Sequence, residues 1–187
     1  MISELDAINQ LLSVTGDAPV SSIGSTYDQA VIARRILREV STEKQAKGYW
    51  FNEMDNYTIV KDSDGFINLP ADTLRCDIGG DKGRLVQRGL RIYDKVENSY
   101  VIGENIIVDL VVDLKWTLLP QSFRQFIIAH ASLRYSSQYF GSDTVQDAIL
   151  QDIQMHSLTL IAEDIDNRDI NMLENTRSGN IAFRNRR

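Results

Sequence analysis

The stretch KGYWFNEMDNYTIV, residues 47–60, marks the change from helix to strand that decides the fold. Apolar side chains recur at helical spacing before it, and Gly48 supplies the left-handed residue that commonly ends a helix. After it, alternating residues favour a strand. Three adjacent aromatics, Tyr49, Trp50 and Phe51, cannot all face one side of a helix. They are candidates for a domain joint, a ligand-stacking platform or a subunit interface.

Helices are expected on both sides of this stretch. Ser3 is a typical N-cap, Thr26 and Gln29 have the spacing of a capping box, and Pro120 stands where proline opens a helix. Gly141 is the expected end of the third helix. The predicted helices cover residues 3–14, 26–48, 120–141 and 142–165.

The residues between the second and third helices favour strands. Tyr57–Val60, the turn DSDG and Phe66–Leu69 are typical of a hairpin, because Asp-Gly is a common two-residue turn. Residues 105–116, NIIVDLVVDLKW, are rich in Val, Ile and Leu and give the strongest strand prediction. We therefore expect a small antiparallel sheet inserted between helices.

These elements predict an α+β fold in which four segments of the chain make up the bundle, the lobe and a tail. A four-helix bundle is formed by residues 1–56 and 117–165, and a small antiparallel β lobe, residues 57–116, is inserted into it. Residues 166–187 lose the helical period and are predicted to be an extended C-terminal tail.

Composition narrows the classes of function. The chain has 187 residues, 26 acids and 20 bases, for a net charge of −6, and a single cysteine, Cys76. A lone cysteine excludes an intramolecular disulfide framework and favours synthesis in a reducing cytoplasm. The longest apolar run is short and contains aspartates, so no membrane association is expected. Tight DNA binding needs a basic surplus, which occurs only at the end of the chain, at Arg177, Arg184, Arg186 and Arg187.

The sequence predicts no catalytic, metal or cofactor site. The DSDG turn fails as a calcium loop because Val60 and Ala71 would occupy ligand positions, and IGGDKGR lacks the phosphate-loop spacing. His130, His156 and Cys76 have no zinc-site spacing. A polysaccharide hydrolase remains the alternative, since such enzymes use paired carboxylates. Its candidate acids are Glu163, Asp164, Asp166 and Asp169.

Three collinear stretches point to a family. They are LDAINQLLSVTGDAPVSSI (residues 5–23), ARRILREVSTEKQAKGYWFN (33–52) and LPQSFRQFIIAHASLRYSSQYFGSDTVQDAILQ (119–151). In their order along the chain and in their amino-acid sequence they resemble tail tubular protein A, the head-to-tail adaptor of Autographiviridae-type short-tailed bacteriophages. The resemblance extends from about residue 4 to about residue 160 and is weaker in the β lobe, apart from LPAD at residues 69–72.

The resemblance implies a structural role in the virion. Members of this family form a twelve-subunit ring beneath the portal, join the DNA-filled head to the nozzle (tubular protein B), and carry attachment sites for tail fibres. Their fold is similar to that of other head-completion adaptors, with a helical bundle, an inserted β lobe and a C-terminal extension that docks on the portal. DNA would pass through the ring without tight binding.

Physical reasoning then suggests roles for two sets of residues. Tyr49, Trp50 and Phe51 are a candidate ring interface, because aromatic side chains contribute much of the energy of interfaces. Packing between bundle and lobe is the alternative, with Trp50 or Phe51 turned inward and Tyr49 nearer the surface. The terminal arginines are candidates for docking on the portal, and a disordered end without a role is their alternative. A peptide- or nucleic-acid-binding module is a further class of function.

Overall fold

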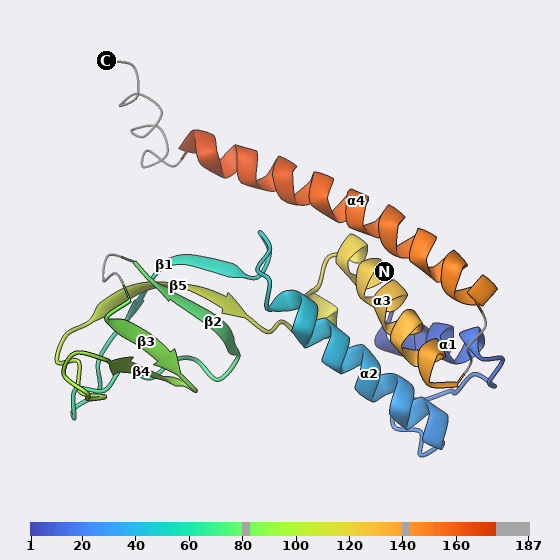
Figure 1. Ribbon diagram of the computed structural model, residues 1–187, viewed down its shortest axis with the longest axis horizontal. Helices are drawn as coiled ribbons and strands as arrows, with labels where there is room; N and C mark the ends of the chain where they lie inside the picture. The colour runs from blue at the N-terminus through green and yellow to red at the C-terminus, as the bar shows by residue number, and fades with distance from the viewer. Residues whose placement is uncertain (80–82, 140–142, 175–187) are drawn as a thin grey trace. The chain divides into compact units, whose positions relative to one another are not determined.

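The computed structural model describes residues 1–79, 83–139 and 143–174. The chain divides into two compact units, which we describe separately (Figure 1). One unit, here called the helical unit, combines Met1–Val40 with the chain from Trp116 onward, and the other, the sheet unit, is Ser41–Lys115. The elements are α1 (Glu4–Val14), α2 (Asp28–Gln45), β1 (Glu53–Ile59), β2 (Thr73–Ile78), β3 (Leu85–Arg88), β4 (Arg91–Asp94), β5 (Ile106–Val112), a 3₁₀ turn η1 (Trp116–Leu118), α3 (Gln121–Tyr139) and α4 (Asp143–Glu174).

Helix α1 begins where the sequence predicted. The Ser3 hydroxyl accepts a hydrogen bond from the Asp6 amide at 3.1 Å, and the Asp6 carboxylate accepts one from the Ser3 amide at 3.0 Å. This reciprocal pair satisfies two amides that the first helical turn leaves without partners. The helix buries four apolar side chains along one face: Ala7, Ile8, Leu11 and Leu12.

Helix α3 is the centre of the helical unit. It packs against α1 and α4, and Figure 1 shows it between α4 and the first part of α2. Its side chains are buried around most of its circumference, which explains why its sequence shows no clear polar face. Fully buried members include Phe123, Ile127, Ala131 and Tyr135.

A buried arginine ties α3 to the segment before it. Arg124 is only 4% exposed, and its guanidinium donates to three main-chain carbonyls: Leu119 at 3.0 Å, Thr117 at 2.9 Å and Ile2 at 2.9 Å. The indole of Trp116 also donates to the Ile2 carbonyl, at 3.1 Å. Arg124 therefore joins the N-terminus to the turn that leads into α3.

Helix α4 runs further than predicted. We expected an extended tail from residue 166, but the helix continues to Glu174, so the prediction is wrong for residues 166–174. These residues include neither glycine nor proline, and a weak apolar period alone does not end a helix. Two local contacts support the continuation: Asn167 donates to the Glu163 carbonyl at 2.7 Å, and Arg168 pairs with Asp164 at 2.9 Å.

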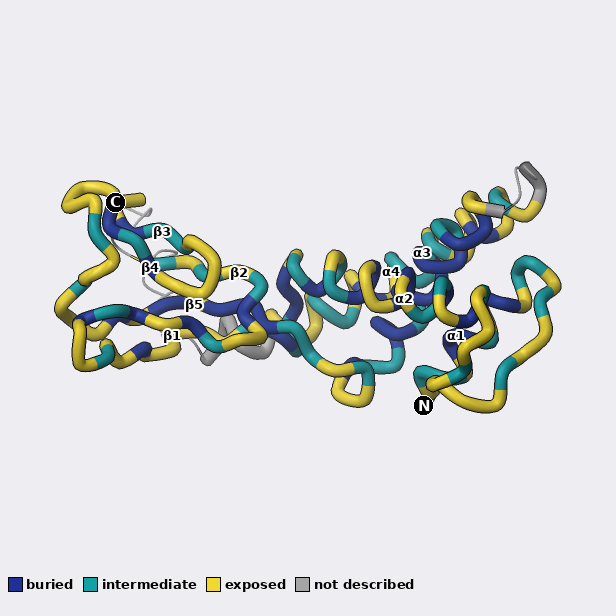
Figure 2. Tube along the Cα trace, turned by 90° about the horizontal axis from the view of Figure 1, so that it is seen from below, coloured by how far each residue is buried: buried dark blue, intermediate teal, exposed yellow. Residues whose placement is uncertain are grey.

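The sheet unit contains two small antiparallel sheets. Strand β5 is the centre of a three-stranded sheet of order β1-β5-β2, and β3 pairs with β4. Figure 2 shows buried residues recurring along β5, which confirms the strongest strand prediction. Apolar side chains of both sheets form one core: Ile59, Ile67, Leu69, Leu85, Ile92, Ile106, Val108, Leu110 and Val112.

The predicted hairpin between residues 57–60 and 66–69 is wrong. Strand β1 pairs with β5, whereas Phe66 and Asn68 bridge to Val101 and Arg91. The DSDG turn itself exists, with Gly65 at φ 83°, and the Asp62 carboxylate accepts from the Phe66 amide at 2.8 Å. The turn therefore leads the chain from one sheet to the other instead of back along β1.

Strand β1 also begins earlier than expected, at Glu53 instead of Tyr57. A bulge between Met54 and Tyr57 conceals the strand period, and Asn56 adopts a φ of 53° there. The Asn56 amide donates to the Asp109 carboxylate at 2.8 Å, which holds the bulge against β5.

Candidate assembly sites

The aromatic turn, Gly48–Asn52, joins α2 to β1. Tyr49 is 6% exposed, and Trp50 and Phe51 are half-buried. The rings of Tyr49 and Phe51 stack with centroids 5.6 Å apart, and Trp50 meets Phe51 edge-on at 5.0 Å. The prediction that Tyr49 lies nearest the surface is therefore wrong. The chain reverses at Gly48, where φ is 86°, and this turns the first aromatic inward.

Asn52 holds this turn closed. Its side-chain amide donates to the carbonyls of Gln45 at 3.0 Å and Val112 at 2.9 Å, and its oxygen accepts from the Tyr49 amide at 2.9 Å. The side chain is 1% exposed, so these bonds replace water that it has lost. One carboxamide thus links the end of α2, the aromatic turn and the end of β5.

Gln45 makes the second half of this link. Its side-chain nitrogen donates to the Asp113 carboxylate at 3.0 Å, and its oxygen accepts from the Leu114 amide at 2.8 Å. Sequence reasoning missed both carboxamides as joint residues. The available signal was their position: Gln45 lies in the last turn before Gly48, the predicted helix end, and Asn52 directly follows the aromatic triplet.

Helix α4 carries two rows of side chains that are mainly apolar, with Asp164 at the end of the inner row and Gln154 within the outer row. The inner row packs toward α3 and consists of Ile149, Ile153, Leu160 and Asp164. The outer row is exposed throughout, and its members follow one another at spacings of four, four, three and four residues. Leu158, Ile161 and Ile165 in it are 68%, 51% and 52% exposed. The outer row consists of Leu150, Gln154, Leu158, Ile161 and Ile165.

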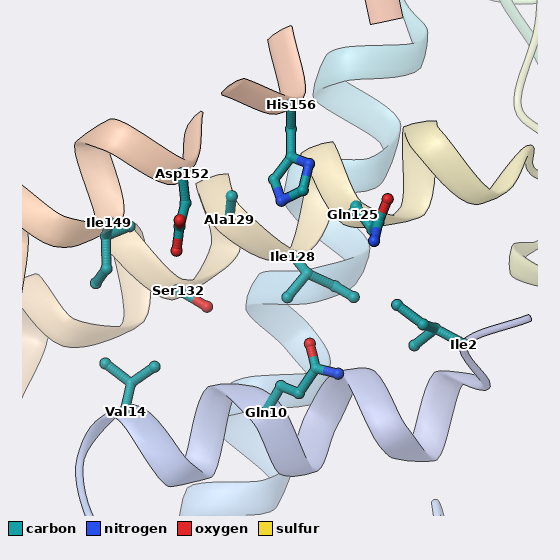
Figure 3. Close-up of a pocket in the computed structure, with 10 residues that line it drawn as sticks. All are labelled: Ile2, Gln10, Val14, Gln125, Ile128, Ala129, Ser132, Ile149, Asp152 and His156. Carbon is teal, nitrogen blue, oxygen red and sulfur yellow. The ribbon is translucent and has the colours of Figure 1, made fainter. Parts of the chain in front are cut away.

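A groove lies between α1, α3 and α4 within the helical unit (Figure 3). It has a volume of about 300 Å³ and mixes apolar with polar walls. His156 and Asp152 face it from α4, and Gln125 and Gln10 approach from α3 and α1. The remaining lining residues are Ile2, Val14, Ile128, Ala129, Ser132 and Ile149.

The residues considered for chemistry lie apart from one another. His130 packs edge-on against Phe126 at 4.6 Å, and Cys76 lies half-buried on β2. Burial, together with the charges of Asp77 and Asp109, raises the pKa of the Cys76 thiol to about 11. Within the described ranges, His, Cys, Asp and Glu side chains form no group of three that would hold a metal ion.

The candidate acids of the hydrolase alternative all belong to α4. The Ser122 hydroxyl donates to the Glu163 carboxylate across the α3–α4 contact, and Asp164 pairs with Arg168 one turn along. Asp166 is exposed. The side chain of Asp169 and all four candidate portal-docking arginines, Arg177, Arg184, Arg186 and Arg187, lie outside the described residues.

Comparison with known proteins identifies the family. The family model described as "Tail tubular protein" matches residues 5–170. The chain belongs to this family. A similar curated protein is tail tubular protein A of Klebsiella phage KP34, with 24% identity over 165 residues, which cover 88% of each chain. The resemblance found in the three collinear stretches is thus confirmed, and it extends through the β strands as well.

Membership of the tail tubular family establishes a bacteriophage tail structural protein and hence a component of the virion. The family is structural, which agrees with the expectation that the chain's main role is not enzymatic. No described helix is both long enough and apolar enough to cross a bilayer.

Proposed function

We propose that this tail tubular protein is a ring-forming head-to-tail adaptor, which connects the portal to the tail nozzle and lines the channel for DNA ejection. The observation that carries the proposal is the outer row of α4. A helix that already buries an inner row has no need of a second apolar row for its own folding. An exposed row of this kind marks a contact with another protein.

Self-association is the simplest use of such a row in a tube-forming protein. Copies that contact one another head to tail through two different faces close into a ring when the rotation permits. A stable interface of this type buries roughly 800 Å² on each partner. The outer row alone is smaller than this, and the half-buried Trp50 and Phe51 of the sheet unit are candidates for a separate ring contact. Tyr49 supports the aromatic turn from beneath.

The remaining partners follow from the resemblance. We assign portal docking to the C-terminal arginines Arg177, Arg184, Arg186 and Arg187, whose positive charge is complementary to an acidic groove. The ring of twelve copies, the nozzle (tubular protein B) and the tail fibres are the further expected contacts. A net charge of −6 suits a channel wall that repels the DNA backbone.

Particle size tests the proposal directly. The full chain, alone and mixed with portal protein, would be examined by native mass measurement and negative-stain imaging. We expect rings on the portal, and a monomer in isolation is consistent with assembly on that platform. A chain that stays strictly monomeric in both conditions would refute the adaptor function. Deletion of Arg177–Arg187 should leave the fold intact and abolish portal capture.

A further inference from the structure

We propose that the outer row of α4 docks on the exposed face of α2 in the next copy, so that these two helices form the repeating ring contact. This inference rests on the proposed ring. It specifies which two surfaces of neighbouring copies meet, in which direction the contact runs around the ring, and which charges favour it.

Helix α4 is longer than α3, and its outer row faces away from α3. With 32 residues α4 is about 48 Å long, whereas the 19 residues of α3 span about 28 Å. The Ser122–Glu163 contact places Glu163 beside the first turn of α3. The helix therefore continues past its neighbour from about Ile165, and the outer row faces away from it along its whole length.

Helix α2 offers a matching face in the same unit. Tyr27, Val31, Arg35 and Arg38 follow one another at spacings of four, four and three residues, and all are exposed. The opposite side of the helix is buried, through Ala30, Ala33, Leu37 and Val40. The α2 face begins with two apolar residues and ends with two arginines.

Charge favours pairing of these two faces. Residues 145–167 of α4 contain five acids and neither Lys nor Arg, and Asp147 and Asp166 lie exposed near the two ends of the outer row. Arg38 supplies positive charge on the α2 face, and so does Arg35, whose guanidinium also lies 3.8 Å from the Glu39 carboxylate one turn along. Complementary charges at a contact accelerate encounter and suppress wrong partners.

The same charges disfavour pairing of α4 with itself. In a two-fold antiparallel arrangement, the Asp147 end of one helix would lie beside the Asp166 end of the other. Like charges juxtaposed in this way are unfavourable. Since the two complementary faces lie on different helices, with α3 between them (Figure 1), their contact is heterologous and propagates from copy to copy.

The two faces also match in length. The α2 face from Tyr27 to Arg38 spans about 16 Å, and the outer row from Leu150 to Ile165 spans about 22 Å, at 1.5 Å per residue. Small Val31 can receive a larger side chain such as Leu158, as in knobs-into-holes packing. Each face would thus cover most of the other.

Single-cysteine cross-linking within rings assembled on the portal tests the contact. The variants are Leu158→Cys on α4, Val31→Cys on α2 and the double variant, treated with a short bis-maleimide. A mixture of the two single variants should give covalent dimers, the double variant a ladder of higher species, and each single variant alone no product. The wild-type chain with its half-buried Cys76 and Ser13→Cys on the exposed side of α1 are the controls, and both should remain uncross-linked.

Dimers from Leu158→Cys alone would show that α4 pairs with itself and would overturn the inference. Rings without any cross-link would overturn it too, while leaving the adaptor function standing. A chain that never forms rings would refute both. As a second readout, Arg35→Glu with Arg38→Glu should weaken ring assembly at least tenfold, and adding Asp147→Lys with Asp166→Lys should restore most of it. If Arg35→Glu with Arg38→Glu left ring assembly unchanged, this result would contradict the role of charge in the contact.

Discussion

The carboxamide of Asn52 donates to the main-chain carbonyl of Gln45 at 3.0 Å, across the turn that separates α2 from β1. Because the same group also binds Val112 and Tyr49, the end of a helix, a reversal of the chain and the central strand are coupled through one side chain. The three adjacent aromatics therefore stand on a turn whose shape is set by an amide rather than by the rings themselves.

Replacing Asn52 should destabilise the sheet unit. Asn52→Ala removes the Asn52 partner of the Tyr49 amide and of the Val112 carbonyl, whereas the Gln45 carbonyl keeps its bond from the Gly48 amide. A buried group left without a partner costs about 1–3 kcal/mol. Asn52→Asp should be worse, because it replaces a donor by a negative charge beside two carbonyl oxygens. Urea unfolding followed by tryptophan fluorescence would measure the loss.

Asn105→Ala is the matched control for Asn52. Asn105 is exposed and accepts one bond from the Lys61 amide at 3.1 Å, so its removal should change the free energy of unfolding by less than about 1 kcal/mol. Equal losses at the two positions would show that the buried amide has no special role.

Local signals in the sequence were sufficient for most of the elements. The Ser3 cap, the left-handed Gly48 and the Val- and Ile-rich run of β5 each act within a few residues, and all three are where they were predicted. The α+β class followed from the switch of period at residues 47–60.

Features that depend on residues far apart in the sequence could not be predicted from these local signals. Strand β1 pairs with β5 some 50 residues away, and nothing in the DSDG turn distinguishes this from a local hairpin. The inward position of Tyr49 depends on Asn52 and Val112, which meet only in the folded unit. The extent of α4 was missed because residues 166–174 lack a clear apolar period, although they contain neither glycine nor proline to end the helix.

Arg124 should be essential for the stability of the helical unit. Arg124→Met removes the guanidinium donor from the Leu119 and Thr117 carbonyls and leaves the Ile2 carbonyl with the Trp116 indole alone, and we expect a loss of about 2–4 kcal/mol. Arg124→Lys should be intermediate, since a single ammonium group cannot reproduce the planar fork that reaches three acceptors. Chemical denaturation monitored by circular dichroism would measure both variants.

Arg168→Met is the control for the loss of an arginine. It removes an exposed pair with Asp164 on the same unit, and such pairs contribute roughly 0.3–0.5 kcal/mol. If Arg124→Met were as mild as Arg168→Met, the carbonyl contacts would not be what stabilises the turn before α3.

Gly48→Ala should destabilise the chain more than Gly16→Ala. Both glycines end helices at positive φ, 86° and 77°, so each alanine carries the backbone strain of about 1–2 kcal/mol. At Gly48 the added carbon would also crowd the Glu53 carboxylate and lie 3.2 Å from a methyl group of Val111, whereas nothing lies within 4 Å at Gly16. Parallel urea titrations of the two variants would separate strain from crowding, and equal losses would exclude the crowding.

Acid should weaken the sheet unit through Asp94. Hydrogen bonds from the Arg84 guanidinium, which lies 2.6 Å away, and from the amides of Glu97 and Val96 lower the pKa of Asp94 from 3.8 to about 2. A group whose pKa is lower in the folded state stabilises the fold above its unfolded pKa, and this stabilisation is lost as the pH falls from about 4 toward 2.

Asp94→Asn should therefore lower the melting temperature at pH 7 and flatten its decline between pH 4 and 2. Arg84→Gln should flatten the same decline, because it removes the main donor. A decline that is equally steep in wild type and both variants would assign the acid sensitivity to other carboxylates.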